Sequence, residues 1–319
     1  MNSELDKKFI DEYNVVPEEA KTLARLDDYG EIVQYDQAGT SPHSIIFSLK
    51  NGHVTRIYGK EFFPDLKILG SFPYLRELII KFTYTQSFEG LKELRNLEKL
   101  KIDSVDVENT HILEEISTLE NLREVHLLNI YNIKKIEFLE NLENLEKLSI
   151  TGEINYCIKG EISEIRGLQN LTKLKELKLY ANKVSEIKNI NHLSNLEILD
   201  LGGNNISEIK GLENLNNLKE LNLRWNKITK IRGLDTLSNL EILDISKNRI
   251  KDLSGLENLK SLKQLYLKDN NIPNIKGLNM SERNWGVNSL QKIIEYCQKK
   301  DLNRLSGNNC KDDRNNSHR

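Results

Sequence analysis

The chain of 319 residues is poor in cysteine and has no long apolar run. Cys157, Cys297 and Cys310 are odd in number and far apart, which argues against a disulfide framework and a CxxC zinc site and is typical of a reducing compartment. No apolar run approaches about 18 residues, and the start MNSELDKKFI lacks a hydrophobic signal core. The sequence therefore predicts a cytoplasmic protein that does not span a membrane.

The chain also lacks a large excess of either positive or negative charge. The chain has 46 basic and 48 acidic residues and a net charge of -2, so no bulk attraction to nucleic acid or to an anionic membrane is expected. No GxGxxG or GxxxxGK[ST] pattern is present to hold a phosphate. We expect no cofactor, no metal, no nucleic-acid or membrane partner, and a monomer.

What the sequence does contain is a repeat. From residue 174 a 22-residue unit occurs five times and fits the pattern LxxLxLxxNxI. The opening leucines are Leu174, Leu196, Leu218, Leu240 and Leu262. The fourth and sixth residues of LxxLxL point inward from a short strand, and the residues between them face solvent. After the asparagine, apolar residues at wider spacing predict a return as a turn of helix or 3₁₀ structure. One copy cannot bury enough to fold alone, so the copies are expected to stack into one elongated domain.

Two further residue types recur at fixed positions of the repeat, one polar and one small. A structural asparagine ladder is expected to satisfy backbone groups where each strand turns, and it comprises Asn182, Asn204, Asn226, Asn248 and Asn270. Glycines followed by leucine mark a tight backbone position before the return, and they are Gly167, Gly211, Gly233, Gly255 and Gly277.

Looser copies without that asparagine precede the regular ones. They open at Leu75, Leu97, Leu122 and Leu145, and a further degenerate copy starts at Val54. The last of them, which is 29 residues long, is expected to loop out between 151 and 161. Ahead of these copies, HSIIFSLK-NG-HVTRIY predicts a hairpin with Asn51 and Gly52 in the turn, which would cover the open end of the first repeat.

The opposite charges along the predicted sheet alternate from copy to copy. The second residues of successive copies are Arg76, Glu98, Arg123, Glu146, Lys175, Glu197, Lys219, Glu241 and Lys263. The third residues alternate in the opposite sense at first, as Glu77, Lys99, Glu124, Lys147 and Glu176. In a parallel sheet in register these side chains stack about 4.8 Å apart, so the alternation predicts ladders of opposite charge.

Because those columns neutralise themselves, the fifth, seventh and eighth positions are the better candidates for recognition. They carry the aromatic and arginine residues that dominate binding hot spots. With Ile198 from a third position, the candidate partner-binding residues are Tyr180, Ile198, Asp200, Asn222, Arg224, Trp225, Asp244, Tyr266 and Lys268. Gly202 and Gly203 are expected to leave a dip that a partner side chain can enter. The competing interpretation of Trp225 is structural packing beside Asn226.

The 22-residue copies with their I-x-x-I-x-G-L return resemble leucine-rich repeats of the class that includes a regulatory subunit of protein phosphatase one and the bacterial internalins. The resemblance spans residues 54 to 280. The hairpin NGHVTRI beside a short helix is similar to caps of intracellular prokaryotic and archaeal members. Internalins are secreted and carry surface-attachment sequences, and we expect neither feature in this protein.

In the phosphatase regulator, acidic and aromatic residues of the concave face grip the enzyme. The resemblance places Asp200, Asp244, Trp225 and Tyr266 on matching columns. Basic side chains interrupt this acidic character, namely Lys178, Arg224 and Lys268.

The predicted fold class is α/β: a leucine-rich-repeat solenoid with a curved parallel sheet on the concave face and short helical or 3₁₀ segments on the convex face. Residues 1–40 are expected to form a helical appendage, with a helix from Pro17, and 41–281 the solenoid with its hairpin cap. Residues 282–302 are expected to form a helical C-terminal cap that buries Leu290, Ile293, Ile294 and Cys297, and 303–319 a disordered tail.

The function predicted is a non-catalytic module that binds a protein through the concave sheet, as a regulatory subunit or scaffold. The alternative is a scaffold that binds through the irregular copies and the 151–161 loop. A distant alternative is a hydrolase that uses Asp200 and Asp244, about 10 Å apart at the backbone. His126 has no cysteine or serine motif nearby to activate.

Overall fold

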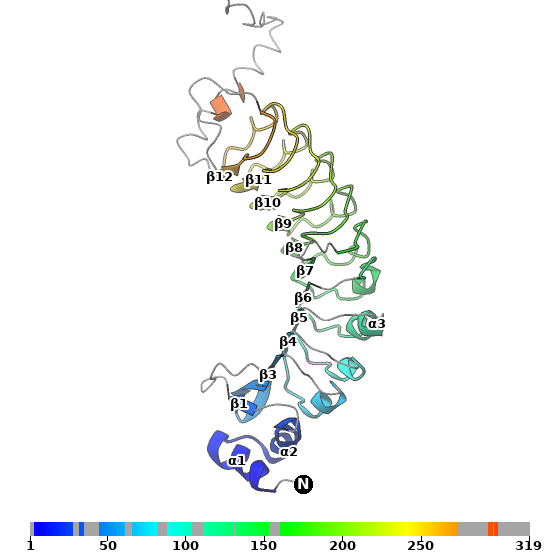
Figure 1. Ribbon diagram of the computed structural model, residues 1–319, viewed down its shortest axis with the longest axis vertical. Helices are drawn as coiled ribbons and strands as arrows, with labels where there is room; N and C mark the ends of the chain where they lie inside the picture. The colour runs from blue at the N-terminus through cyan, green and yellow to red at the C-terminus, as the bar shows by residue number, and fades with distance from the viewer. Residues whose placement is uncertain are drawn as a thin grey trace, which may run out of the picture.

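The computed structural model describes residues 3–27, 32–34, 45–60, 66–81, 88–103, 111–129, 132–152, 160–272, 293–295 and 297–298. These residues form a curved solenoid built on one sheet, whose 12 strands follow each other in chain order from β1 to β12. Figure 1 shows the strands in a row along one side of the arch and the return segments along the other. The predicted leucine-rich-repeat solenoid is therefore confirmed.

The N-terminal end is covered by two helices and three strands. They are α1 (Ser3–Tyr13), α2 (Pro17–Leu26), β1 (Ile32–Gln34), β2 (Ile45–Lys50) and β3 (His53–Lys60). The helix from Pro17 was predicted, whereas α1 and the edge strand β1 were not. The apolar residues of α1 gather on one face, and Phe9 packs edge-on against Phe47 of β2 with 6.0 Å between ring centroids. The helices therefore close the first repeat rather than stand apart from it.

The predicted hairpin is confirmed. Strands β2 and β3 pair antiparallel, and their turn places Asn51 at φ 53° and Gly52 at φ 79°, the positive angles that an Asn-Gly turn supplies. Strand β3 also pairs in parallel with β4 (Glu77–Lys81), with Ile57 opposite Leu78. That register belongs to a copy that opens at Val54, as predicted.

A buried carboxylate joins the helical cap to this first copy. Glu19 of α2 is 1% exposed, and its Oε2 accepts the backbone N–H of Val54 at 2.6 Å. Its other oxygen lies 3.0 Å from Nδ1 of His53. The sequence analysis did not single out Glu19, because its partner lies 35 positions away.

The remaining strands are parallel and shorten along the array. Those of the irregular copies after β4 are β5 (Lys99–Asp103), β6 (Glu124–Leu128) and β7 (Lys147–Thr151). Those of the regular copies are β8 (Glu176–Lys178), β9 (Ile198–Asp200), β10 (Glu220–Asn222), β11 (Ile242–Asp244) and β12 (Gln264–Tyr266). Each pairs in register with the next, so equivalent positions of neighbouring copies stand side by side.

The return segments differ between the two halves. The irregular half carries η3 (Leu66–Ser71), η4 (Leu91–Glu93), α3 (His111–Ser117) and η5 (Glu137–Leu139). Across 160–272 the return has no helix and runs through single turns, in which the N–H of Leu215 donates to the carbonyl of Leu212. At Gly211, φ is 77° and a Cβ would come within 2.6 Å of the Ile187 carbonyl oxygen, so adjacent copies approach too closely there for an added side chain. Among the described residues, the predicted helical or 3₁₀ return is thus found in the irregular copies and not across 160–272.

A single hydrophobic core runs the length of the arch, from Phe9 to Cys297. The inward fourth and sixth positions are buried in every regular copy, as Leu221 and Leu223 illustrate. At the far end Ile293, Ile294 and Cys297 are buried, and the Cys297 thiol donates to the carbonyl of Leu253 at 3.2 Å. Leu290 and the 303–319 tail lie outside the described residues, and the domain boundaries at 40, 281 and 302 stay predictions.

The asparagine that follows each regular strand bonds across copies. Nδ2 of Asn204 donates to the carbonyls of Leu179 in the preceding copy and Leu201 in its own, each at 2.9 Å. Its Oδ1 accepts the N–H of Val184 at 2.9 Å. The same cross-copy donor and acceptor bonds are made by Asn182, Asn226, Asn248 and Asn270.

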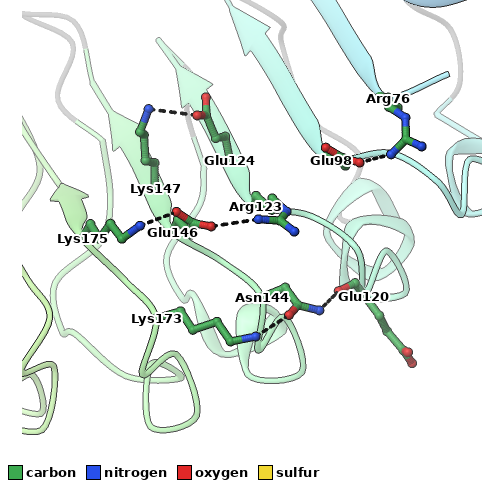
Figure 2. Close-up of polar contacts among 10 residues, drawn as sticks. All are labelled: Arg76, Glu98, Glu120, Arg123, Glu124, Asn144, Glu146, Lys147, Lys173 and Lys175. Atoms are coloured by element: carbon green, nitrogen blue, oxygen red, sulfur yellow. Dashed lines mark hydrogen bonds and ion pairs between the residues drawn. The ribbon is translucent and has the colours of Figure 1, made fainter.

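A second asparagine column, which the sequence analysis missed, stands immediately before the opening leucines. Each amide donates to a backbone carbonyl of the preceding copy, and the residues are Asn96, Asn121, Asn144, Asn195, Asn217 and Asn239. Where Lys173 replaces the asparagine, its Nζ donates to Oδ1 of Asn144 at 2.6 Å, as Figure 2 shows. The recurrent Asn-Leu pair was the available signal, and unlike the first column it runs through both halves.

The predicted charge ladders are present as ion pairs. In the second-position column Glu146 lies between Arg123 at 3.1 Å and Lys175 at 2.7 Å (Figure 2). In the third-position column Glu124 lies between Lys147 at 2.9 Å and Lys99 at 3.4 Å. These pairs are partly exposed, so each contributes no more than about 1 kcal/mol to stability.

Reversing one charge in the ladder should destabilise the array slightly. Glu197 accepts a hydrogen bond from Lys219 at 2.7 Å, and that bond, with the charges of Lys219 and Lys175, lowers the pKa of Glu197. Glu197→Lys places three cations in succession, so its urea midpoint should fall below that of the wild type at low salt and approach it at high salt. Coincident midpoints at low ionic strength would show that the ladder has no energetic role.

Candidate protein-binding surface

The regular concave face is defined here as the fifth, seventh and eighth positions of the copies that open at Leu174 to Leu262. The register sets the fifth positions side by side on consecutive strands. In order they are Lys178, Asp200, Asn222, Asp244 and Tyr266. The structure therefore brings the sequence-predicted residues of β9 to β12 onto one continuous surface, with Ile198 half-buried at the neighbouring third position.

The eighth position has a left-handed backbone in every regular copy. The φ angles are 56° at Ala181, 70° at Gly203, 61° at Trp225, 54° at Lys247 and 60° at Asp269. Glycine adopts this conformation freely, but a bulky side chain does so at a cost of roughly 1–2 kcal/mol. The conformation itself belongs to the turn that every regular copy makes, and Trp225 stands out because it places a bulky side chain there.

Trp225 is exposed rather than packed into the core. Its side chain and Tyr74 are the exposed large hydrophobic residues of the described chain, and Trp225 is 41% accessible. The ammonium of Lys247 lies 4.3 Å from the ring centroid and the guanidinium of Arg224 lies 5.7 Å away. Asn226 beside it makes its bonds to backbone groups. The geometry thus favours an exposed aromatic contact over structural packing.

The fifth-position acids and amide also cap their own strands. Oδ1 of Asp200 accepts the N–H of Gly202 at 2.9 Å, and Oδ1 of Asn222 accepts the N–H of Arg224 at 3.0 Å. Asp244 accepts both the N–H and the hydroxyl of Ser246, at 2.9 and 2.6 Å. This local role was missed, because the sequence analysis treated these residues only as contacts for a partner.

Burial raises the pKa of Asp200, and the bonds from Gly202 and Asn222 and the charge of Lys178 only partly offset it. A carboxyl whose pKa is higher in the folded than in the unfolded chain binds more protons when folded. Its contribution to stability therefore falls as the pH rises from the ordinary aspartate range through the folded-state pKa.

Asp200→Asn should remove the loss of stability that the Asp200 carboxyl causes as the pH rises. Asn222 already performs the same N–H capping in the next copy, so the amide fits the position. The free energy of unfolding of the variant, measured from pH 4 upward, should match or exceed that of the wild type and should not show the decline assigned to Asp200. A variant that is less stable by the same amount at every pH would mean that the charge itself is needed.

The dip expected at Gly202 and Gly203 is not open, and that expectation was wrong. A Cβ built on Gly202 would lie 2.9 Å from Cδ2 of Tyr180, so the half-buried Tyr180 ring lies over the glycine. The absence of a side chain lets the neighbouring ring fold across. Gly202 and Gly203 are both buried.

A hollow on this face lies two copies further along, at Ser246. A groove of about 400 Å³ is lined by Arg224, Asp244, Ser246, Lys247, Tyr266, Lys268 and Asp269. We call it the Ser246 notch. Its signal in the sequence was a small residue between two long cations in the seventh-position column, Arg224 and Lys268, and the analysis by residue type overlooked it.

The structure gives less support to the alternative sites, namely the Asp200 and Asp244 pair, His126 and the 151–161 loop. Asp200 and Asp244 are separated by the strand of Asn222 and both cap backbone N–H groups, which leaves them poorly placed for hydrolysis. Burial lowers the pKa of His126, whose Nε2 lies 3.6 Å from Glu124. Within the described ranges no group of three His, Cys, Asp or Glu side chains is arranged to hold a metal. Most of the 151–161 loop, residues 153–159, lies outside them.

Comparison with known proteins supports the repeat assignment. A family model described as Leucine Rich repeats (2 copies) matches residues 194–236 and 238–280. A search of curated proteins found no relative by sequence. Together with the geometry, the match defines the chain as a leucine-rich-repeat solenoid. The part of the chain described by the structure contains no helix that is long and apolar enough to cross a membrane.

Solved structures show the same fold. An internalin from Listeria monocytogenes is 24% identical, with a TM-score of 0.53 over 71% of this chain and 71% of that one. A leucine-rich-repeat protein of Leptospira interrogans is 26% identical, with a TM-score of 0.50 over 66% of this chain and 58% of that one. The ectodomain of the Arabidopsis thaliana receptor kinase GASSHO1/SCHENGEN3, in complex with CASPARIAN STRIP INTEGRITY FACTOR 2, is 20% identical, with a TM-score of 0.57 over 76% and 32%.

Proposed function

We propose that this protein is a non-catalytic interaction module that binds a protein partner on the regular concave face. The observation that carries the proposal is Trp225, an exposed aromatic ring held at a strained positive φ in the centre of that face. Tyr180 and Lys268 bound the surface four strands apart, which spans about 19 Å and suits a protein interface better than an enclosed small molecule. Curved solenoids commonly offer their concave surface for binding.

The finer parts of the proposal concern how the module works. It acts as a regulatory subunit or scaffold in the cytoplasm, as a monomer, without nucleic-acid or membrane partners. The near balance of 46 basic and 48 acidic residues supports the last point. The described part of the face mixes acids with Arg224, Lys247 and Lys268, so the likeness to a phosphatase regulator is partial.

Trp225→Ala and Tyr266→Ala should each weaken binding of the native partner by about 2 kcal/mol or more. Folding should be spared, because Ala181 occupies the same eighth position as Trp225 at φ 56° and shows that alanine is accommodated there. The partner can be captured from a lysate of the native organism by the wild type, and its affinity for purified variants then measured by calorimetry. Thermal unfolding of each variant provides the check on folding.

The control is Lys210→Ala, an exposed residue of the return segment that pairs with Glu208 at 3.7 Å. It should leave affinity unchanged. If the control weakens binding as much as the two aromatic changes, or if Trp225→Ala mainly unfolds the protein, the concave face is not the binding surface.

A further inference from the structure

We propose that the Ser246 notch is a subsite for a carboxylate, supplied by an aspartate or glutamate side chain of the protein partner. The proposal rests on the proposed function, because it names the chemistry that part of the regular concave face recognises. Four features of the notch support it: the spacing of its cations, an unsatisfied guanidinium nitrogen, the bonds that Asp244 already accepts from Ser246, and its aromatic borders.

The notch is formed by a short side chain between two long cations. Arg224, Ser246 and Lys268 are the seventh residues of consecutive copies, and each follows a strand that pairs in register with the next. The two cations therefore start about 10 Å apart at the backbone. Ser246 is 5% exposed and its hydroxyl donates to Asp244, so it forms a low, satisfied floor. Lys247 adds a third cation at the border.

Arg224 gives the strongest indication of the ligand. Its Nε is buried and, among the described residues, finds no hydrogen-bond partner. A guanidinium is always charged and donates only, so a buried N–H without an acceptor is costly. Neither Lys247 nor Lys268 forms an ion pair within the described ranges. An incoming carboxylate would supply the missing charge, and a shift of the Arg224 side chain toward the notch would bring its buried Nε to the acceptor, in the paired geometry that arginine favours.

Asp244 and Asp269 also line the groove and raise the opposite possibility, a basic ligand. The hydrogen bonds decide between the two. Oδ1 of Asp244 already accepts two bonds from Ser246, whereas Nε of Arg224 has none. Three cations against two carboxylates leave the lining with an excess of positive charge. A lysine entering the notch would leave the Arg224 donor unsatisfied and bring a like charge beside it.

The aromatic borders indicate what the acid is attached to. Trp225 lies beside Arg224, and Tyr266 lines the notch with its hydroxyl already donating to Gln264 at 2.9 Å. The apolar parts of these rings remain for contact. The geometry therefore suits an acidic residue with apolar neighbours in a protein segment better than a free inorganic anion.

The test uses a phage-displayed library of random dodecapeptides selected on the full chain, with elution by excess unlabelled protein. Peptides that depend on Trp225, judged by loss of binding to Trp225→Ala, should be enriched in Asp and Glu relative to the unselected library. For one such synthetic peptide, Arg224→Met and Lys268→Met should each weaken binding about tenfold, and Arg224→Lys about threefold. Lys210→Met should have no effect.

A matched peptide with glutamine in place of the acid separates recognition from a structural role of Arg224. This peptide should bind weakly to the wild type and equally weakly to Arg224→Met, because the two changes remove one interaction. Any of three results would overturn the carboxylate subsite. The losses from the peptide change and from Arg224→Met could be additive, the selected peptides could lack acids, or inorganic phosphate could displace the bound peptide when the free acidic peptide does not. Neutral peptides that still require Trp225 would leave the proposed function standing. If the selected peptides bind equally well to Trp225→Ala, or if no peptide is selected, both the carboxylate subsite and the proposed function are overturned.

Discussion

Leu221→Ala should lower the free energy of unfolding by about 2 to 5 kcal/mol. Leu221 is the inward fourth residue of the copy that opens at Leu218, is 1% exposed, and lies between Leu199 and Leu243 in the sheet register. Removing three carbon groups leaves a cavity that neighbouring copies cannot fill, because the spacing of the strands is fixed by their hydrogen bonds. Urea unfolding followed by circular dichroism measures the change.

The matched control is Glu220→Ala, one residue away on the same strand, whose side chain is exposed. It should change stability by less than about 0.5 kcal/mol. A loss equally small for Leu221→Ala would mean that the fourth position does not point into the core, and the whole repeat assignment would be wrong.

Asn226→Ala is expected to cost about 2 to 4 kcal/mol, the second large effect. The amide donates to the carbonyls of Leu201 and Leu223, each at 3.0 Å, and its Oδ1 accepts the N–H of Ile206 at 2.9 Å. These bonds are buried, so alanine leaves several backbone groups without partners and without water.

Asn217→Ala is the natural comparison, because Asn217 belongs to the exposed second column and donates once, to the carbonyl of Ser194 at 2.9 Å. Water can replace that bond, and the cost should stay near 0.5 to 1 kcal/mol by the same urea measurement. Equal losses for the two variants would show that the buried ladder has no special role in joining copies.

The sequence was sufficient for the strands, the inward residues and the ladders because each depends on position within a period. Val54 as the opening residue of a degenerate copy, and the alternation through Glu146, follow from register alone. In such cases the backbone repeats, so what holds for one copy holds for the next.

The site was less predictable because it depends on side-chain conformations and on local backbone angles. The Tyr180 ring covers Gly202, and this contact depends on the conformation of the tyrosine side chain, which the sequence does not give. Gly203 gave a partial indication in the sequence that the eighth position has a left-handed backbone. Trp225 at the equivalent position gave no indication of that conformation. The hydrogen bond between the Val54 N–H and the Glu19 carboxylate could not be predicted for a different reason, because it joins residues far apart in the chain without any periodic relation.

Hydroxyl-radical footprinting of the chain with its captured partner tests the central claim most directly. Trp225 and Tyr74 are 41% and 49% exposed and lie on different parts of the solenoid, the first on the regular concave face and the second just before β4. The proposed interface predicts that the partner protects Trp225 from oxidation several-fold while Tyr74 reacts as in the free protein. Unchanged oxidation of Trp225, with protection at Tyr74 instead, would contradict it.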